Sequence, residues 1–464
     1  MRKILTGALF ILPVVFFGVC YFLMTVWGED IIQGAGTTPD VWNDIKGAFM
    51  HNSRLSDMYA WTVINFFDFQ YSFGVDTIFR LIDVVMAAGI FYLMTSMMLG
   101  RRPKWKLEDA LLFGLSFLTV MLTPHGYTMY RGFSVIHNYL IIGLSTIGFG
   151  LPFVRSYTGE EVPKLYQKWW FALVIGLVFG MSSNITPVAF LIWFVLMKVW
   201  QGWREKAWKK VWRLPAWQVW MLAGMVITVA IAYVFGAGVS TYANNPVYTE
   251  TYDYVAVNEI FTSFGSSLVR IAKHIAVNFG YCFGMVGAMA VILGGLAIVV
   301  AKITKKELKI WPKETASRRV IGANLGFAAV YLLCGSQITL PVRLALPAYL
   351  ALVVALGVLV KGWWIESGVL DEKVLEPMLS VLAVGLMVLI VVFKAEFAIE
   401  YRGPMRQAFE TIRESTDETV CLSPEIAKPK KLPFVNLGQD ETFGEWALPH
   451  MTVYRKKVEY CSQY

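Results

Sequence analysis

Long apolar blocks without charge are the feature that most constrains this chain. The first, Ile4–Trp27, contains no charged residue. As an α-helix rising 1.5 Å per residue it would span about 36 Å, enough to cross a hydrocarbon core of about 30 Å. Only 16% of the 464 residues are charged and 56% are hydrophobic, whereas soluble domains carry about 25% charged residues. We therefore expect an all-α polytopic membrane protein, because a helix satisfies its own backbone hydrogen bonds inside a bilayer.

Hydrophobic runs of this kind recur along the chain and predict about eleven transmembrane helices. The block at 4–27 is too long for the apolar part of a cleaved signal peptide, so we expect it to be retained as the first crossing. The predicted crossings are 4–27, 77–99, 107–122, 135–152, 169–184, 187–200, 216–236, 280–301, 320–338, 342–361 and 374–395.

The placement of cations predicts the orientation of these crossings. With the N-terminus inside, the short inner segments carry most of the Lys and Arg residues. The outer loops between crossings then carry only Lys46, Arg54, Arg131, Arg270 and Lys273. Because cytoplasmic loops concentrate Lys and Arg, we expect an N-in, C-out protein of the cell (plasma) membrane. The net charge of +8 thus reflects topology, and we expect no nucleic-acid partner.

One stretch, 169–200, leaves two interpretations open. Its apolar run is interrupted by the polar segment 181–187, and both of its flanks belong to the inner side. The two legs, as helices, reach only about 24 and 21 Å, which is short of a full hydrocarbon core. The stretch is therefore either a two-helix crossing or a re-entrant hairpin. A turn at bilayer depth would need protein or a water-filled cavity around it.

The predicted organisation is a transmembrane domain followed by a small extracytoplasmic region. In the first outer loop, apolar stripes at 41–50 and 55–67 predict two short helices that either lie in the membrane interface or pack onto the bundle. The predicted parts are the transmembrane domain 1–395, its outer loops 28–76 and 237–279, and the C-terminal region 396–464.

The C-terminal region differs in composition from the rest. Its Pro-rich stretch 428–433 favours a small irregular domain over another helix. Cys421 and Cys461 both fall in this region, which the topology places in a compartment that can be oxidising. A disulfide between these two cysteines is a hypothesis.

Acidic residues gather in the first outer loop. Glu29 and Asp30 directly follow Trp27, so they should lie at the outer membrane surface on a rigid helix end. Carboxylates there can act as a general base on a substrate hydroxyl, or hold a divalent cation near a phosphate. The sequence does not decide whether a metal is used, and an outer helix end also tolerates acids without any function.

Two outer arginines are candidate phosphate ligands. Arg54 lies between the two predicted loop helices, and Arg343 opens the tenth crossing. A guanidinium suits bidentate binding of phosphate. The alternatives are a salt bridge to a neighbouring acid for Arg54 and interfacial snorkelling for Arg343. Within the second crossing, Arg80 and Asp83 are three apart and are expected to pair on one helix face.

Several kinds of site have no signature in the sequence. There is no Gly-rich phosphate loop of the P-loop or dinucleotide type, and the short basic inner loops leave no room for a cytoplasmic nucleotide-binding domain. The spacing of the five histidines does not match a zinc site. These absences disfavour ATP-driven transport and a cytoplasmic nucleotide-sugar donor.

The layout resembles the GT-C class of multi-pass membrane glycosyltransferases, and in particular a poorly characterised bacterial branch of sugar-transferase-like proteins. This chain has Glu29-Asp30 where the class usually has Asp-Asp or Asp-Glu, and Asn52-Ser53-Arg54 where relatives often have Asn-Gly-Arg. The segments that carry the resemblance are Gly28-Glu-Asp30, Asn52-Ser-Arg54, His137-Asn138-Tyr139, Ser183-Asn184, Arg343 with Pro347, and Trp446–Tyr454.

The resemblance implies transfer of a sugar from a polyprenyl-phosphate donor to a cell-envelope glycan, lipid or polymer on the outer face, usually with inversion. It implies Asp30 as the base, with Glu29 second. It implies that the donor or acceptor is bound by Arg54, Arg343, Asn52, His137, Asn138 and Asn184.

Two other classes stay open. A polymerase or ligase of lipid-linked oligosaccharides would use similar substrates. A flippase or transporter of lipid-linked sugars would need ionisable groups near the bilayer midplane and often an internal repeat. Most polar residues here fall on the outer side, which favours the transferase.

Overall fold

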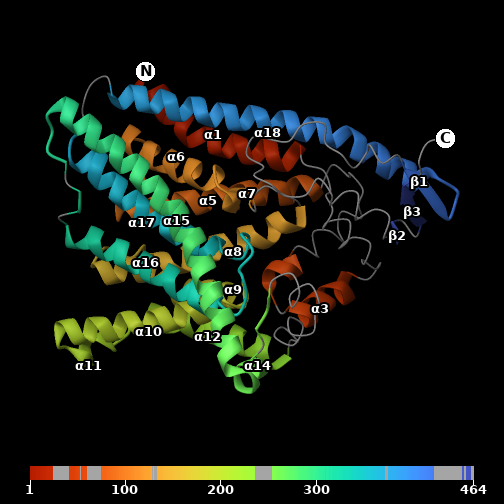
Figure 1. Ribbon diagram of the computed structural model, residues 1–464, viewed down its shortest axis with the longest axis horizontal. Coiled ribbons are helices and arrows are strands. Elements are labelled where there is room, and N and C mark those ends of the chain that lie inside the picture. Colours follow the sequence, from red (N-terminus) through yellow and green to blue (C-terminus); the bar gives the residue numbers. More distant parts are fainter. Residues whose placement is uncertain are drawn as a thin grey trace.

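The computed structural model presents a bundle of helices that run along one common direction, followed by a small sheet (Figure 1). We call the end that holds the N-terminus proximal and the end at which α1 (Arg2–Leu23) stops distal. The structure describes residues 1–23, 41–52, 54–59, 75–127, 129, 133–235, 253–255, 257–308, 310–312, 314–370, 375–422, 452–453 and 456–460.

The helices follow the apolar blocks of the sequence, because a segment in lipid must satisfy its backbone hydrogen bonds internally. A helical turn at 55–59 lies between α3 and α5. The other helices are α3 (Val41–Asn52), α5 (Val75–Leu99), α6 (Leu107–Met121), α7 (Pro124–Tyr127), α8 (Phe133–Thr158), α9 (Trp169–Gly180), α10 (Thr186–Glu205), α11 (Trp208–Val211), α12 (Ala216–Phe235), α14 (Val257–Thr262), α15 (Phe264–Thr304), α16 (Thr315–Cys334), α17 (Leu346–Val360), the π-helical turn η2 (Lys361–Glu366) and α18 (Leu375–Glu414).

Seven helices in the described part of the chain are long and apolar enough to cross a membrane: α1, α5, α8, α12, α15, α17 with η2, and α18. The chain is therefore a predominantly helical membrane protein, as predicted. The predicted crossings on α6, α9, α10 and α16 also fall on helices of the bundle. Of these, α9 is a short apolar helix of 12 residues.

The core of the bundle is built around α17. Nearly every side chain of this helix is buried, and it packs against α5, α6, α8, α15 and α16. Gly357 lets α17 approach α5 closely, since a Cβ there would lie 2.3 Å from the Met98 sulfur. Burial on all sides explains why α17 is uniformly apolar, whereas peripheral helices face lipid on one side.

The closest helix pair is α9 with α12. A Cβ on Gly176 would lie 2.2 Å from the Met221 carbonyl oxygen, and one on Gly224 would lie 2.5 Å from the Leu173 carbonyl oxygen. Small residues at such positions let membrane helices touch along their backbones, where lipid gives no hydrophobic drive for association. These glycines thereby fix α12 against the short helix α9.

Two helices are longer than predicted. α15 begins at Phe264 rather than near 280, so the end of the predicted outer loop 237–279 is helical, and α15 runs diagonally across the bundle (Figure 1). α18 continues past 395 to Glu414 and projects beyond the bundle. The boundary drawn at 395/396 therefore lies inside a helix. Hydropathy marks where the apolar part of a helix stops, but its backbone hydrogen bonds continue into polar sequence.

The C-terminal region is not irregular throughout. A three-stranded sheet of order β1-β3-β2 follows α18, with β1 (Thr419–Leu422) parallel to β3 (Lys456–Tyr460) and β2 (Thr452–Val453) antiparallel to it. Cys421 in β1 is disulfide-bonded, whereas Cys20, Cys282 and Cys334 are free. Its predicted partner Cys461 lies outside the described residues, so that pairing stays a prediction.

The first predicted loop helix is present as α3, and part of the second is the turn at 55–59. On α3, Trp42 is 73% exposed and Met50 is 47% exposed. The turn at 55–59, in contrast, packs on the bundle. Packing on the bundle therefore describes the turn at 55–59, and an interfacial position of α3 stays a prediction.

Candidate functional site

A cavity of about 290 Å³ lies at the distal end of the bundle. Its walls come from the turn between α9 and α10 with the start of α10, the end of α16 with the segment between α16 and α17, Tyr233 of α12, and the stretches at Arg54 and Tyr254. We call it the distal cavity. It is lined by Arg54, Ser183, Asn184, Ile185, Val188, Tyr233, Tyr254, Cys334, Gly335, Gln337, Ile338 and Leu344.

The positive charge of the distal cavity comes from Arg54, which is 8% exposed. Its Nε donates to the Asp57 carboxylate at 2.9 Å. The other Asp57 oxygen accepts a hydrogen bond from the Asn138 side-chain amide of α8. A buried ion pair of this kind is tolerable only when its remaining polar atoms are also satisfied. Asp57 and Asn138 therefore hold the guanidinium in a fixed position at the cavity wall.

The turn at 55–59 is fastened to the polar turn between α9 and α10. The Leu55 amide donates to the Met181 carbonyl oxygen at 2.7 Å, and the Ser56 hydroxyl donates to the Ser182 carbonyl oxygen at 3.1 Å. These bonds supply the protein contacts that a turn at membrane depth requires. As a result, Ser183 and Asn184 face the cavity from one side and Arg54 from another.

The opposite wall depends on the distal half of α15. Asn278 donates to the Ile338 carbonyl oxygen and accepts from the Leu340 amide, at 3.1 and 2.9 Å. The Val255 amide donates to the Gln337 carbonyl oxygen at 2.8 Å. The segment between α16 and α17 is thus held by bonds to the Asn278 side chain and to the Val255 backbone, which add to the turn hydrogen bonds within the segment.

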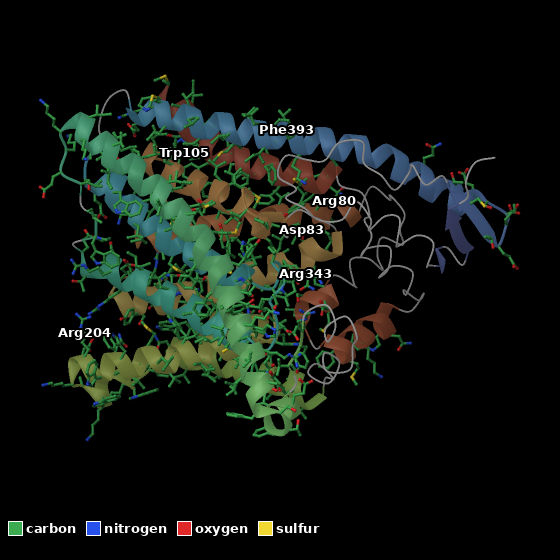
Figure 2. The ribbon with its side chains drawn as sticks, viewed as in Figure 1. Arg80, Asp83, Trp105, Arg204, Arg343 and Phe393 are labelled. Carbon is green, nitrogen blue, oxygen red and sulfur yellow. The ribbon has the colours of Figure 1, made fainter. Side chains whose placement is uncertain are left out.

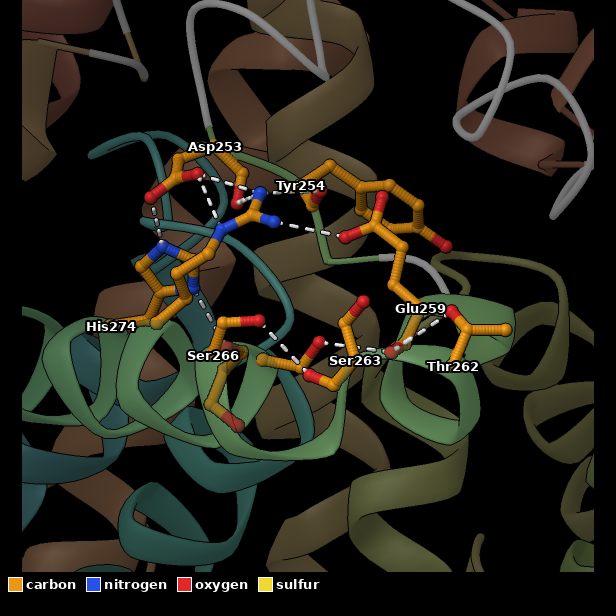
Figure 3. Close-up of polar contacts among 10 residues, drawn as sticks. Asp253, Tyr254, Glu259, Thr262, Ser263, Ser266 and His274 are labelled. Carbon is orange, nitrogen blue, oxygen red and sulfur yellow. Dashed lines mark hydrogen bonds and ion pairs between the residues drawn. The ribbon is translucent and has the colours of Figure 1, made fainter.

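A charged network beside this wall holds Tyr254 in place (Figure 3). Arg270 contacts Asp253 at 2.7 Å and Glu259 at 2.9 Å, and it also donates to the Tyr254 carbonyl oxygen at 3.1 Å. His274 is fully buried, with Nδ1 3.1 Å from the Ser336 carbonyl oxygen and Nε2 3.1 Å from the Asp253 carboxylate.

Electrostatics within this network favour the ionised carboxylate. Partial burial raises the pKa of Asp253, but hydrogen bonds from His274 and Arg270 more than offset it, and the pKa lies below its ordinary value. Burial, followed by the nearby Glu259 charge, raises the pKa of Tyr254. Asp253 therefore stays charged and Tyr254 stays neutral at physiological pH.

The distal cavity combines one cationic side chain with neutral hydrogen-bonding groups and apolar walls. Arg54 offers a guanidinium, and Ser183, Asn184, Gln337 and Tyr254 offer neutral hydrogen-bonding groups. Apolar walls of Ile185, Val188, Ile338 and Leu344 surround them. Within the described residues no group of three or more His, Cys, Asp or Glu side chains is placed to hold a metal ion.

Three of the predicted site residues meet at the distal cavity. Arg54 and Asn184 line it, and Asn138 reaches Arg54 through Asp57. Arg343 precedes the lining residue Leu344, is half-buried, and lies toward the same end of the bundle (Figure 2). The salt-bridge alternative for Arg54 is confirmed by its contact with Asp57, whereas its role as a phosphate ligand stays a prediction.

Other predicted site residues are not placed by the structure. Glu29 and Asp30 lie outside the described residues, and the side chains of Asn52 and His137 are likewise not described. Arg80 donates to the Tyr21 carbonyl oxygen, and Asp83 is buried; their pairing with each other stays a prediction.

Sequence reasoning missed several residues of the distal cavity. Asp57 was one of seven acids in the loop, and its distance of three residues from Arg54 on a helical turn was the available signal. Tyr254 and Gln337 stand in connecting segments without any periodic pattern. Lys394 of α18 is a buried cation at 6% exposure, inside a predicted crossing.

Comparison of the chain with models of protein families, with curated proteins and with solved structures gives no match.

Proposed function

We propose that the chain is an integral membrane glycosyltransferase that moves a sugar from a polyprenyl-phosphate donor to a glycan, lipid or polymer acceptor on the outer face of the plasma membrane. The observation that carries the proposal is the buried Arg54, the one charged side chain among the described residues that line the distal cavity, whose other lining side chains are neutral, some polar and some apolar. A lipid-linked phosphate has the matching chemistry: an anionic head, a polar sugar and a long apolar chain.

In the proposed reaction the acceptor hydroxyl attacks the anomeric carbon of the donor sugar. A carboxylate takes the hydroxyl proton, and the bond between the anomeric carbon and the phosphate oxygen breaks. The negative charge that develops on the departing polyprenyl phosphate is stabilised by Arg54, because a fixed cation in a poorly hydrated site needs no reorganisation. Asn184 and Ser183 hydrogen-bond sugar hydroxyls, and Arg343 is a second phosphate ligand.

Asp30 is proposed as the base, with Glu29 second, because both follow the first crossing at the membrane surface. To act as a general base, a carboxylate must come within hydrogen-bond reach of the acceptor hydroxyl. The same pair could bind a divalent cation instead, and a chelator distinguishes the two: it abolishes transfer only if a metal is needed.

The first test is binding of a polyprenyl phosphate to the protein in lipid nanodiscs. Arg54→Gln with Asp57→Asn removes the charge pair together, so that no lone buried charge remains. This double variant should bind about 10- to 100-fold more weakly, since a charge-assisted hydrogen bond contributes roughly 1.5–3 kcal/mol. The matched control is Arg102→Gln, an exposed arginine at the proximal end.

The second test is transfer from a panel of polyprenyl-phosphate sugars. Asp30→Asn should abolish transfer while leaving carrier binding intact, because the base acts on the acceptor. Unchanged carrier binding in the Arg54 and Asp57 double variant would refute the phosphate role of the cavity. Carrier binding without transfer of any sugar, but with movement of the lipid across the membrane, would support a flippase instead.

A further inference from the structure

The exposed apolar face of α10 ends in tryptophans and cations at the proximal end. Exposed apolar side chains recur along one face of this helix every three or four residues, the pattern of a helix with one side in hydrocarbon. Beyond them, Trp200 is 50% exposed and Trp203 is 66% exposed. The exposed apolar residues are Val188, Leu191, Ile192, Val195, Leu196 and Val199.

The chain then folds back on itself in a fixed geometry. Lys206 ends α10 in the left-handed region at φ 50°, and the short helix α11 packs on α10 through Gly202. A Cβ on Gly202 would lie 2.5 Å from the Trp208 ring, so only glycine allows this contact. The eight exposed residues displayed here, which we call the tryptophan–cation surface, are Trp200, Trp203, Arg204, Lys206, Trp208, Lys209, Trp212 and Arg213.

The charge of the tryptophan–cation surface is uncompensated in the described part of the protein. Arg204, Lys206, Lys209 and Arg213 make no ion pair among the described residues, and Glu205 is the one acid between 198 and 213. Figure 2 shows Arg204 at the proximal end of α10.

The same character continues onto the neighbouring helices. An open concavity of about 830 Å³ lies where α9 and α12 begin. Trp169, Trp170 and Trp220 line it together with Lys168, and the Trp169 and Trp220 rings are 5.7 Å apart. Tryptophan favours the boundary between hydrocarbon and headgroups, and clustered Lys and Arg at that level attract anionic lipids.

We infer that the tryptophan–cation surface binds the headgroups of anionic phospholipids in the proximal leaflet. The occupant is a lipid rather than an acidic protein because the surface is continuous with the exposed apolar face of α10, which suits contact with hydrocarbon. Indole rings at the level of the headgroups and cations just beyond them match the layers of an anionic leaflet. This inference does not depend on the proposed transferase activity.

The test measures which lipid stays bound when the protein is extracted in mild detergent from vesicles of equal parts phosphatidylglycerol and phosphatidylcholine. Native mass spectrometry gives the ratio of the two bound lipids. Replacing Arg204, Lys206, Lys209 and Arg213 by Gln should lower that ratio by about tenfold or more, because each cation near an anionic leaflet contributes to attraction. The control replaces four exposed proximal cations elsewhere, Lys104, Lys106, Lys302 and Lys306, by Gln.

The control variant should keep the parent ratio within about twofold. An equal fall of the lipid ratio in both variants would show that the preference for phosphatidylglycerol follows from net charge alone, which would overturn the inference. An unchanged ratio in the first variant would overturn it as well. Displacement of phosphatidylglycerol by excess inorganic phosphate would show an ion site, which also overturns it. If the fourfold variant does not fold, Arg204→Gln/Lys206→Gln and Lys209→Gln/Arg213→Gln are measured separately, each with an expected partial loss.

Discussion

At the scale of single residues, the charged side chains around the distal cavity are paired and hydrogen-bonded within the protein. Arg54 and Asp57 are both at least 91% buried, given exposures of 8% and 7%, and Asn138 supplies the third partner. Asp253, Arg270 and His274 repeat the arrangement on the other side of the distal cavity. Both clusters join segments that are distant in the chain, so each one fixes a wall of the cavity as well as satisfying its own charges.

The acid side of this network gives a pH-dependent prediction. The pKa of Asp253 is lowered on folding, so its contribution to stability is complete above the ordinary value of 3.8. That contribution is lost as the pH falls through the lower, folded-state pKa. Asp253→Asn should therefore flatten the loss of stability at acid pH, measured as the apparent melting temperature of the detergent-solubilised protein between about pH 3 and 6.

The control for this measurement is Asp417→Asn, because Asp417 is exposed just beyond α18. That variant should lose stability at low pH as steeply as the parent. An Asp253→Asn protein with the full parental acid slope would show that the network is not ionised in the way its contacts indicate.

At the scale of elements, the distal cavity depends on how closely α9 and α12 pack. α9 carries the polar turn that contributes Ser183 and Asn184, and α12 contributes Tyr233. Their contact passes through Gly176 and Gly224 rather than through large side chains. Because membrane helices gain little hydrophobic energy from association, close backbone packing must hold this pair.

Gly176→Ala should therefore destabilise the bundle. The added Cβ would lie 2.2 Å from the Met221 carbonyl oxygen, so the two helices must separate, at a cost of about 1–3 kcal/mol for overpacking. Unfolding by denaturant in mixed micelles measures the change. Gly284→Ala on α15 is the matched control, because nothing lies within 4 Å of its added Cβ. Equal stability of the two variants would contradict the close packing of α9 on α12.

The positions of elements could be predicted from the sequence far better than their lengths. Apolar blocks mark crossings because bilayer thickness sets a minimum run of apolar residues, a local property. The extension of α15 back to Phe264 and of α18 on to Glu414 has no such local cause. In those parts, tertiary contacts such as those of Arg270 and His274 stabilise the polar turns of the helix. A hydrophobic periodicity in the sequence does not predict such contacts.

For the candidate site, single residues could be predicted from the sequence, but their arrangement in space could not. Arg54 stood out because outer cations are rare, and Asn184 because it interrupts an apolar run. Their meeting at one cavity could not be predicted, since it depends on bonds between the 55–59 turn and the α9–α10 turn, 126 residues apart in the case of Ser56 and Ser182. Such long-range pairing is a property of the whole packing, not of any segment.

At the scale of the whole molecule, the two ends of the bundle differ in character. The distal end holds the cavity, its charged networks and the sheet that follows α18 (Figure 1). The proximal end displays exposed cations and tryptophans on α10 and α11. Cations that face an anionic leaflet are typical of the cytoplasmic side, so the asymmetry favours an N-in orientation with the distal cavity outside.

This orientation predicts which single cysteines react on intact cells. With a membrane-impermeant maleimide, Asp417→Cys at the distal end should be labelled directly, whereas Lys206→Cys at the proximal end should be labelled only after permeabilisation. Among the described cysteines the background is low because Cys20 and Cys282 are buried and Cys421 is disulfide-bonded, and Cys334→Ser removes the half-buried thiol. The reverse pattern would place the distal cavity in the cytoplasm and remove the basis for transfer on the outer face, even if Arg54 binds the lipid carrier as proposed.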